Sequence, residues 1–199
     1  ILAALRSFEG GISFSGIVEA DELLMQYSEK GRKYKSREEY EKAKKKRHPK
    51  VAVLVVSDRE GNLLFKQVGE KKVKNEQLRE ELKSRLSENN LICVKPKKEF
   101  RKAVKGLQSK KVIVNKRQIK RGIYSVKIVE SKISDFKTWL SRFHGVATKY
   151  LQSYLMWFVI MNKYLKELID SDIGRLLNLS SHDRWAWDKY WKLMKLKYK

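Results

Sequence analysis

An unbroken run of six apolar residues, Val51 to Val56, restricts the possible folds of this chain more than any other feature. A strand with one solvated face alternates apolar and polar residues, whereas a continuous apolar run of this length is typical of a strand buried on both faces. Residues 58–62, with the sequence DREGN, are a hairpin-turn signal in which Asp58 is interpreted as a turn residue, and residues 63–68 are predicted to return as a second strand. The run therefore predicts a strand pair inside a sheet that has further layers packed against it.

The remaining segments alternate between strand and helix patterns. Apolar and β-branched clusters predict further strands at residues 14–20, 91–94 and 112–114. Helices are predicted at residues 75–88, 100–107, 131–143 and 148–169. The highly charged residues 29–48 are interpreted as a solvated excursion that includes some helix. The predicted fold class is α/β: a ribonuclease-H-like mixed sheet flanked by helices, with a long C-terminal helical pair and a basic aromatic tail.

The net charge indicates a polyanionic partner. The 199 residues carry 46 Lys and Arg against 23 Asp and Glu, a formal net charge of +23. Such a surplus repels itself in a compact domain, and nucleic acid is the usual partner because each neutralised phosphate releases counterions. Residues 1–30 are the exception, because they contain five acidic residues and only two basic ones, Arg6 and Lys30. We therefore predict a nucleic-acid partner, with double-stranded DNA favoured, and a local acidic site that is a candidate for metal binding.

Two classes of protein are excluded. Cys93 is the single cysteine, so the chain contains neither a disulfide framework nor a cysteine-based zinc site. The longest strongly apolar run, residues 154–161, is too short to span a bilayer. No membrane partner is expected, and an intracellular location is predicted, either nucleoid-associated cytoplasm or nucleus.

Several segments, taken in order, resemble DDE-type insertion-sequence transposases related to the Merlin elements. Residues 16–22, GIVEADE, resemble the "VE-x-DE" strand of that family, and residues 53–61 resemble its next strand and hairpin. The longest match is residues 136–158, FKTWLSRFHGVATKYLQSYLMWF, which resembles the C-terminal helices of the family. The resemblance covers residues 1–165 in outline. It implies the catalytic half of a transposase, acting as a homo-oligomer or within a larger nucleoprotein complex.

The resemblance also implies three acidic positions that hold Mg²⁺ or Mn²⁺ ions for a two-metal reaction. Asp21 matches the first position and lies beside Glu19 and Glu22, for which the alternative interpretation is solvated charges at the strand edge. Lys95 stands where the second aspartate is expected, and a lysine cannot ligate a metal ion and opposes its binding electrostatically. Glu130, at the start of a helix, matches the third position. Asp21 and Glu130 are thus remnant catalytic residues, metal ligands only in an active enzyme, and no cofactor is expected if the triad is degenerate.

Candidate nucleic-acid contacts lie in three parts of the sequence. They are Lys137, Arg142 and Lys149 in the segment that resembles the family helices, Lys45, Lys46 and Arg47 in the basic cluster 44–50, and Trp185, Trp187 and Trp191 in the tail. Lys137 follows Glu130 by about two helical turns and shares its face. The basic cluster equally suits a solvated loop, and the tail aromatics equally suit a helix that docks on the domain or on a partner. The predicted division is the end of a preceding helix (1–12), a ribonuclease-H-like transposase-derived domain (13–170) and a basic, aromatic helical extension (171–199).

Three functions follow as hypotheses. The leading one is a transposase-derived DNA-binding protein that is catalytically inactive because Lys95 replaces the second aspartate. The second is an active, metal-dependent DDE transposase that cleaves DNA and transfers strands, in which Glu99 or another carboxylate supplies the missing ligand. The third is a structural protein that binds RNA or a nucleoprotein particle through the basic surface.

Overall fold

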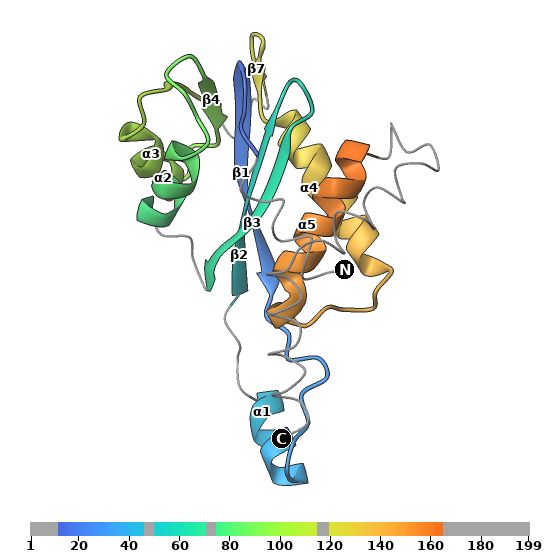
Figure 1. Ribbon diagram of the computed structural model, residues 1–199. Coiled ribbons are helices and arrows are strands. Elements are labelled where there is room, and N and C mark those ends of the chain that lie inside the picture. The colour runs from blue at the N-terminus through green and yellow to red at the C-terminus, as the bar shows by residue number, and fades with distance from the viewer. Residues whose placement is uncertain (1–11, 46–49, 71–74, 115–119, 165–199) are drawn as a thin grey trace, which may run out of the picture.

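Within the described residues the chain forms a central sheet of five strands, which stands between two layers of helices (Figure 1). The computed structural model describes residues 12–45, 50–70, 75–114 and 120–164. The strands are β1 (Ile17–Gln26), β2 (Lys50–Asp58), β3 (Leu63–Glu70), β4 (Leu91–Val94) and β5 (Lys110–Ile113). Their order is β3-β2-β1-β4-β5, with β2 antiparallel to both neighbours and β1, β4 and β5 parallel to one another. This order and orientation are those of ribonuclease-H-like folds, so the predicted fold class is confirmed.

The two faces of the sheet are covered by different helix pairs (Figure 1). One face packs against α2 (Asn75–Lys83) and α3 (Lys98–Lys105), and the other against α4 (Lys127–Ser141) and α5 (Thr148–Tyr164). A short hairpin, β6 (Lys120–Arg121) and β7 (Tyr124–Ser125), precedes α4. The helix α1 (Arg37–Lys45) lies in the connection between β1 and β2 and projects beyond the end of the sheet. The charged excursion predicted from the sequence therefore contains a helix.

The strand β2 is buried on both faces, as its apolar run predicts. Ala52, Leu54 and Val56 belong to the core under α2 and α3, whereas the odd-numbered valines of the same strand belong to the core under α4 and α5. This division follows from the two-residue period of a strand. In β1 the same alternation directs Val18 and Ala20 toward α2 and α3, and the odd residues toward α4.

Three element boundaries differ by four residues or more from those predicted. The strand β1 continues to Gln26 because it pairs with β2 as far as Lys50, where the prediction ended at residue 20. The helix α2 ends at Lys83, although Leu86 still packs against the core. The helix α4 begins at residue 127, before the predicted start at 131. The predicted segments 1–11, 165–169 and 171–199 lie outside the described residues.

Asp58 is the last residue of β2, and its side chain holds the predicted turn that follows. Its carboxylate accepts hydrogen bonds from the backbone N–H groups of Ser15 (3.1 Å), Glu60 (3.0 Å) and Asn62 (2.9 Å), and from the Asn62 side-chain amide (2.7 Å). Gly61 completes the turn at a φ of 95°, a conformation that favours glycine. In the part of the chain that the structure describes, no helix has the length and apolar content needed to cross a membrane.

Candidate functional site

Asp21 lies near the middle of β1 on the face that α4 covers, and its side chain is almost fully buried. One carboxylate oxygen, Oδ2, lies 2.6 Å from Nζ of Lys95. The other, Oδ1, accepts hydrogen bonds from Nζ of Lys97 at 2.9 Å and from the backbone N–H of Glu22 at 2.8 Å. Both oxygens of the carboxylate are therefore satisfied by cations and backbone of the same chain.

Lys95 joins the first and third positions of the predicted triad. It follows directly after β4, which runs parallel to β1 with Val94 opposite Ala20, so the residues that come next, Lys95 and Asp21, lie beside one another. Its Nζ also lies 2.6 Å from Oε1 of Glu130, which sits in the first turn of α4. The structure thus brings together Asp21, Lys95 and Glu130, with the ammonium group between the two carboxylates.

Lys97 is a member of this cluster that the sequence reasoning missed. Besides its contact with Asp21, its Nζ lies 3.6 Å from Glu22. Lys95 and Lys97 flank Pro96 in a tight turn, in which the backbone N–H of Lys97 donates to the carbonyl of Lys95 at 2.8 Å. The pattern K-P-K directly after a strand that pairs with an acidic strand was the signal available in the sequence.

The ion pairs stabilise the charged forms of both partners. Burial by itself would raise the pKa of Asp21, but the hydrogen bonds from Lys95 and Lys97 outweigh it, and the pKa of this carboxyl lies below its usual value. Burial by itself would lower the pKa of Lys95, but its hydrogen bonds to Asp21 and Glu130 raise that pKa above the usual value. Both shifts keep the ammonium and the carboxylate charged at neutral pH.

Glu19 corrects a prediction, because it is fully buried and not a solvated edge charge. Its Oε2 accepts hydrogen bonds from the backbone N–H groups of Ile128 (2.8 Å) and Val129 (3.3 Å), and its Oε1 accepts one from the Ser125 hydroxyl (2.8 Å). Nη2 of Arg59 lies 3.2 Å from Oε1. The helix has no side-chain cap of its own at Val126, so a carboxylate on β1 caps α4 from outside. Glu19 thereby fixes the turn of α4 that carries Glu130.

Glu22 is only partly buried. The interpretation as an edge charge therefore fits Glu22 better than Glu19. Cys93, opposite Glu19 in the β1–β4 register, is a buried free thiol. Burial and the charge of Glu19 raise the pKa of Cys93 to about 11. The thiol is therefore neutral at physiological pH and does not serve as a thiolate nucleophile or ligand.

The residues of this cluster do not fit a pair of divalent metal ions. A two-metal site needs several carboxylate oxygens that converge on the ions. Among the described residues, no group of three or more His, Cys, Asp or Glu side chains is placed to hold a metal ion. Between Asp21 and Glu130 lies the ammonium of Lys95, a donor without a lone pair when protonated. Glu99 lies on α3, on the opposite face of the sheet from α4.

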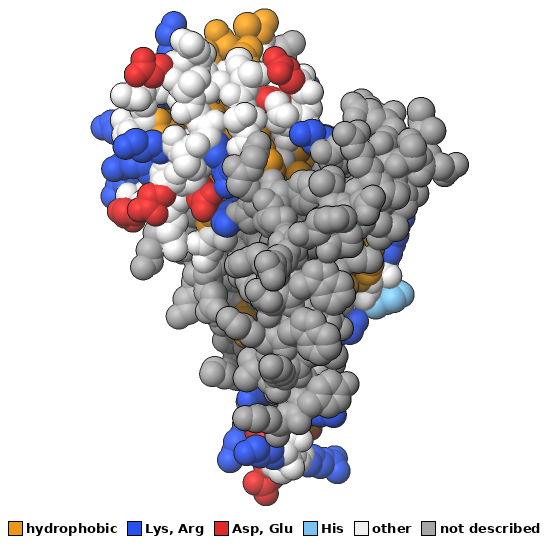
Figure 2. Space-filling model, in the orientation of Figure 1, with side chains coloured by type: hydrophobic (Ala, Val, Ile, Leu, Met, Phe, Trp, Pro, Cys, Tyr) orange, Lys and Arg blue, Asp and Glu red, His pale blue; other side chains and the backbone are white. Residues whose placement is uncertain are grey.

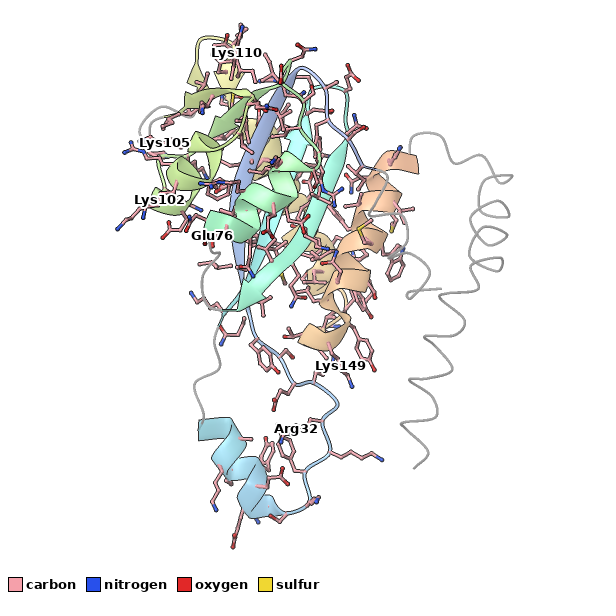
Figure 3. The ribbon with its side chains drawn as sticks, turned by 60° about the vertical axis from the view of Figure 1, so that its left-hand side comes forward. Arg32, Glu76, Lys102, Lys105, Lys110 and Lys149 are labelled. Carbon is pink, nitrogen blue, oxygen red and sulfur yellow. The ribbon has the colours of Figure 1, made fainter. Side chains whose placement is uncertain are left out.

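Three of the candidate nucleic-acid contacts lie among the residues that the structure describes. Lys137 on α4, Arg142 at its C-terminal end and Lys149 on α5 are all exposed. Figure 3 shows Lys149 at the end of α5 that faces the α1 excursion. Lys45 ends α1, and its side chain, like Lys46, Arg47, Trp185, Trp187 and Trp191, lies outside the description.

Comparison with known proteins places this geometry in context. Residues 13–161 match the family model described as the ISXO2-like transposase domain. Among solved structures, the chain is similar to one in the cryo-EM structure of the simian T-cell lymphotropic virus intasome in complex with PP2A regulatory subunit B56 gamma. The identity is 15% and the TM-score 0.42, over 74% of this chain and 49% of that chain, so this chain spans about half of its length. None of the curated proteins shows a significant match to this sequence.

Proposed function

This chain belongs to the ISXO2-like transposase domain family, and from that membership we propose that it is a transposase-derived protein that binds double-stranded DNA without cleaving it. The basic surface of the protein contacts the sugar–phosphate backbone, and this contact requires no divalent metal ion. The former catalytic centre is closed by side chains of the protein itself. The proposal rests on one observation, the position of the Lys95 ammonium between Asp21 and Glu130.

The ammonium of Lys95 opposes catalysis in two ways. It contributes no oxygen or nitrogen lone pair to a metal ion, because a protonated lysine only donates hydrogen bonds. It also contacts Asp21 and Glu130 at 2.6 Å each, where a divalent ion would need the same carboxylates. A metal ion would have to displace Lys95 from Asp21, and Lys97 would still contact the second oxygen. Two-metal strand transfer is therefore not supported by this arrangement.

The same lysines favour approach of a phosphate backbone without metal ions. In a carboxylate site, bound cations remove the repulsion between the protein and the phosphates. Here Lys95 and Lys97 offset the charges of Asp21 and Glu130 within the chain. The net charge of +23 supplies long-range attraction for a polyanion. Binding of DNA is thus expected to be steeply salt-dependent and insensitive to Mn²⁺.

A duplex-binding and nicking assay tests the proposal. Fluorescence anisotropy with a labelled DNA duplex is measured for the wild-type chain in EDTA and in Mn²⁺ at equal ionic strength, and supercoiled plasmid is incubated in parallel. We expect equal affinity under the two conditions and no nicking. Metal-dependent nicking that disappears in Asp21→Ala would refute the proposal and favour an active transposase. A clear preference for structured RNA over duplex DNA in competition would refute the choice of partner.

A calorimetric Mn²⁺ titration tests the role of Lys95 directly. We expect no binding by the wild type and measurable binding by Lys95→Asp, because the substitution removes the ammonium and adds a carboxylate between Asp21 and Glu130. Lys137→Asp is the matched control, since it makes the same charge change at an exposed position of α4. Tight binding by the wild type that depends on Asp21 would contradict the proposal.

A further inference from the structure

The helix α3 carries a stripe of basic side chains on its solvent face. Its inner face consists of Phe100, Ala103 and Val104, which pack in the core under α2 and α3. The exposed face carries Lys98, Arg101, Lys102 and Lys105. The spacing of these four residues, i, i+3, i+4 and i+7, places them along one side of a helix. We call these four residues the α3 stripe.

The charged groups of the α3 stripe have no partner within the described part of the chain. No hydrogen bond or ion pair of these four side chains is recorded there, although the backbone carbonyls of α3 do have partners. The carbonyl of Lys102 accepts from Arg79 at 3.2 Å, and the carbonyl of Lys105 accepts from Lys111 at 3.2 Å. Other basic side chains thus stabilise the helix end, which leaves the stripe free for an external partner.

Figures 2 and 3 show where the α3 stripe lies on the molecule. In Figure 3, Lys102 and Lys105 point away from the sheet, and Lys110 of the edge strand β5 lies on the same side of the molecule. Figure 2 shows Lys and Arg side chains on the upper left of the view, the side on which Figure 1 places α3. The stripe begins one residue after Lys97, at the edge of the closed catalytic centre.

The stripe is unfavourable for the isolated domain. Like charges three and four residues apart on a helix repel one another. Lys102 and Lys105 lie in the last turn, where a cation interacts favourably with the helix dipole, but Lys98 lies in the first turn, where the interaction is unfavourable. Packing and the dipole therefore do not account for the whole stripe, whereas a polyanion would neutralise all four charges.

We propose that the α3 stripe is a binding surface for the phosphate backbone of duplex DNA. The inference rests on the proposed function and assigns it a surface that the sequence did not indicate. The stripe offers flexible cations and no exposed aromatic ring, which suits phosphate contact and not base stacking. The apolar face of α3 is in the core, so the helix has no surface to insert into a membrane interface.

The basic excursion around α1 makes a contrast that strengthens the assignment. Arg32 there is held by Glu29 at 2.8 Å and by Glu39 at 3.3 Å, and Lys30 donates to three backbone carbonyls at the end of α4. These cations build the excursion and attach it to the domain. Those of the α3 stripe have no such role.

The test is the salt dependence of duplex binding by the full chain. Arg101→Gln, Lys102→Gln and Lys105→Gln are combined in one variant, since glutamine keeps a similar helix propensity. If the three side chains contact phosphates, the slope of log K against log salt should fall by about 2.7, at about 0.9 for each contact. The matched control combines Lys33→Gln, Lys35→Gln and Arg37→Gln in the excursion, which removes the same charge at exposed positions. Thermal unfolding should show that neither variant is less stable than the wild type, since the substitutions in α3 also remove repulsion between like charges.

The outcomes separate this inference from the proposed function. A slope that falls markedly in the α3 variant and little in the control supports the α3 stripe as the contact surface. An unchanged slope, or equal decreases in both variants, would overturn the inference while leaving DNA binding intact. A decrease seen with structured RNA and not with duplex DNA would overturn it as well. No binding of DNA by the wild type would reject the proposed function itself, and the inference with it.

Discussion

The two buried carboxylates that β1 presents to α4, Glu19 and Asp21, are two residues apart and are held by different kinds of partner. Glu19 accepts hydrogen bonds from two backbone N–H groups of α4 and from the Ser125 hydroxyl. Asp21 accepts from the ammonium groups of Lys95 and Lys97, and from one backbone N–H of its own strand. Backbone groups of α4 therefore hold Glu19, whereas lysine side chains mainly hold Asp21.

This difference separates the part of the site that maintains the fold from the part that determines chemistry. The Glu19 region joins β1 to α4, so its loss removes a contact between two elements of the core. The Asp21 region depends on the residues that follow β4, which can change without altering the strand or the helix. Under the proposed function, a substitution at Lys95 would change the chemistry of the site and leave the contact between β1 and α4 in place.

The largest expected effect is loss of stability in Glu19→Ala. The substitution leaves the N–H groups of Ile128 and Val129 and the Ser125 hydroxyl without their acceptor, and it removes the buried partner of Arg59. Breaking a buried charged contact of this kind costs about 3–5 kcal/mol. The free energy of unfolding is measured by urea titration followed by circular dichroism.

Glu22→Ala is the control for that prediction. Glu22 is on the same strand, but its ion pair with Lys97 is long at 3.6 Å and partly solvated. The expected loss is less than about 1 kcal/mol. Similar losses in Glu19→Ala and Glu22→Ala would remove the basis for the comparison.

A smaller loss is expected in Lys95→Met. The substitution keeps most of the length of the side chain but leaves Asp21 and Glu130 without the ammonium that lies between them. A buried hydrogen-bonding group left unsatisfied costs about 1–3 kcal/mol. We expect a loss in this range, because Lys97 retains its contact with Asp21 and the side chains of Lys95 and Glu130 are partly exposed. Adding Asp21→Asn should recover part of the loss, so a double-mutant cycle should give a coupling energy above about 0.5 kcal/mol. Additive losses would show that the two residues do not interact in solution.

Acid titration gives a third test of the Asp21 region. Because the pKa of Asp21 in the folded state lies below its usual value, its ionised form stabilises the fold. That stabilisation is complete above the ordinary aspartate pKa and is lost as the pH falls through the folded-state pKa. Asp21→Asn lacks this group, so its stability should decline less steeply than that of the wild type between about pH 5 and pH 2. Parallel curves would mean that Asp21 carries no net ion-pair stabilisation.

Much of the fold is predictable because its signals are local. The apolar run of β2, the turn at Asp58 and the helical stripes of α4 and α5 depend on neighbours in sequence. The length of β1 was underestimated because Glu19, Asp21 and Glu22 interrupt an apolar pattern that only partners on other elements make compatible with burial. The projection of α1 beyond the sheet also has no local signal.

The site was predictable only where order along the chain carries information. Asp21, Lys95 and Glu130 could be assigned from the order of the segments that resemble transposases, and the structure places the three in contact. Lys97 was missed and Glu19 was misinterpreted, because the partner of Lys97, Asp21, lies 76 residues away and that of Glu19, Ile128, lies 109 residues away. A charge pattern does not show which cation meets which carboxylate, and only the parallel pairing of β1 with β4 does so.

A loss between those of Glu19→Ala and its control Glu22→Ala is expected in Arg59→Gln, and this variant tests the comparison of the two carboxylates most directly. Arg59 pairs with Glu19 at 3.2 Å, but its side chain is 40% exposed, and solvent screens a pair of this kind. If the backbone N–H groups of α4 are the main partners of Glu19, removing the guanidinium should cost about 1 kcal/mol, well below the loss in Glu19→Ala. Urea titration of the two variants under the same conditions measures the ratio. A loss in Arg59→Gln as large as that in Glu19→Ala would show that Glu19 is also held chiefly by a side chain, and the two carboxylates of β1 would then no longer differ in kind.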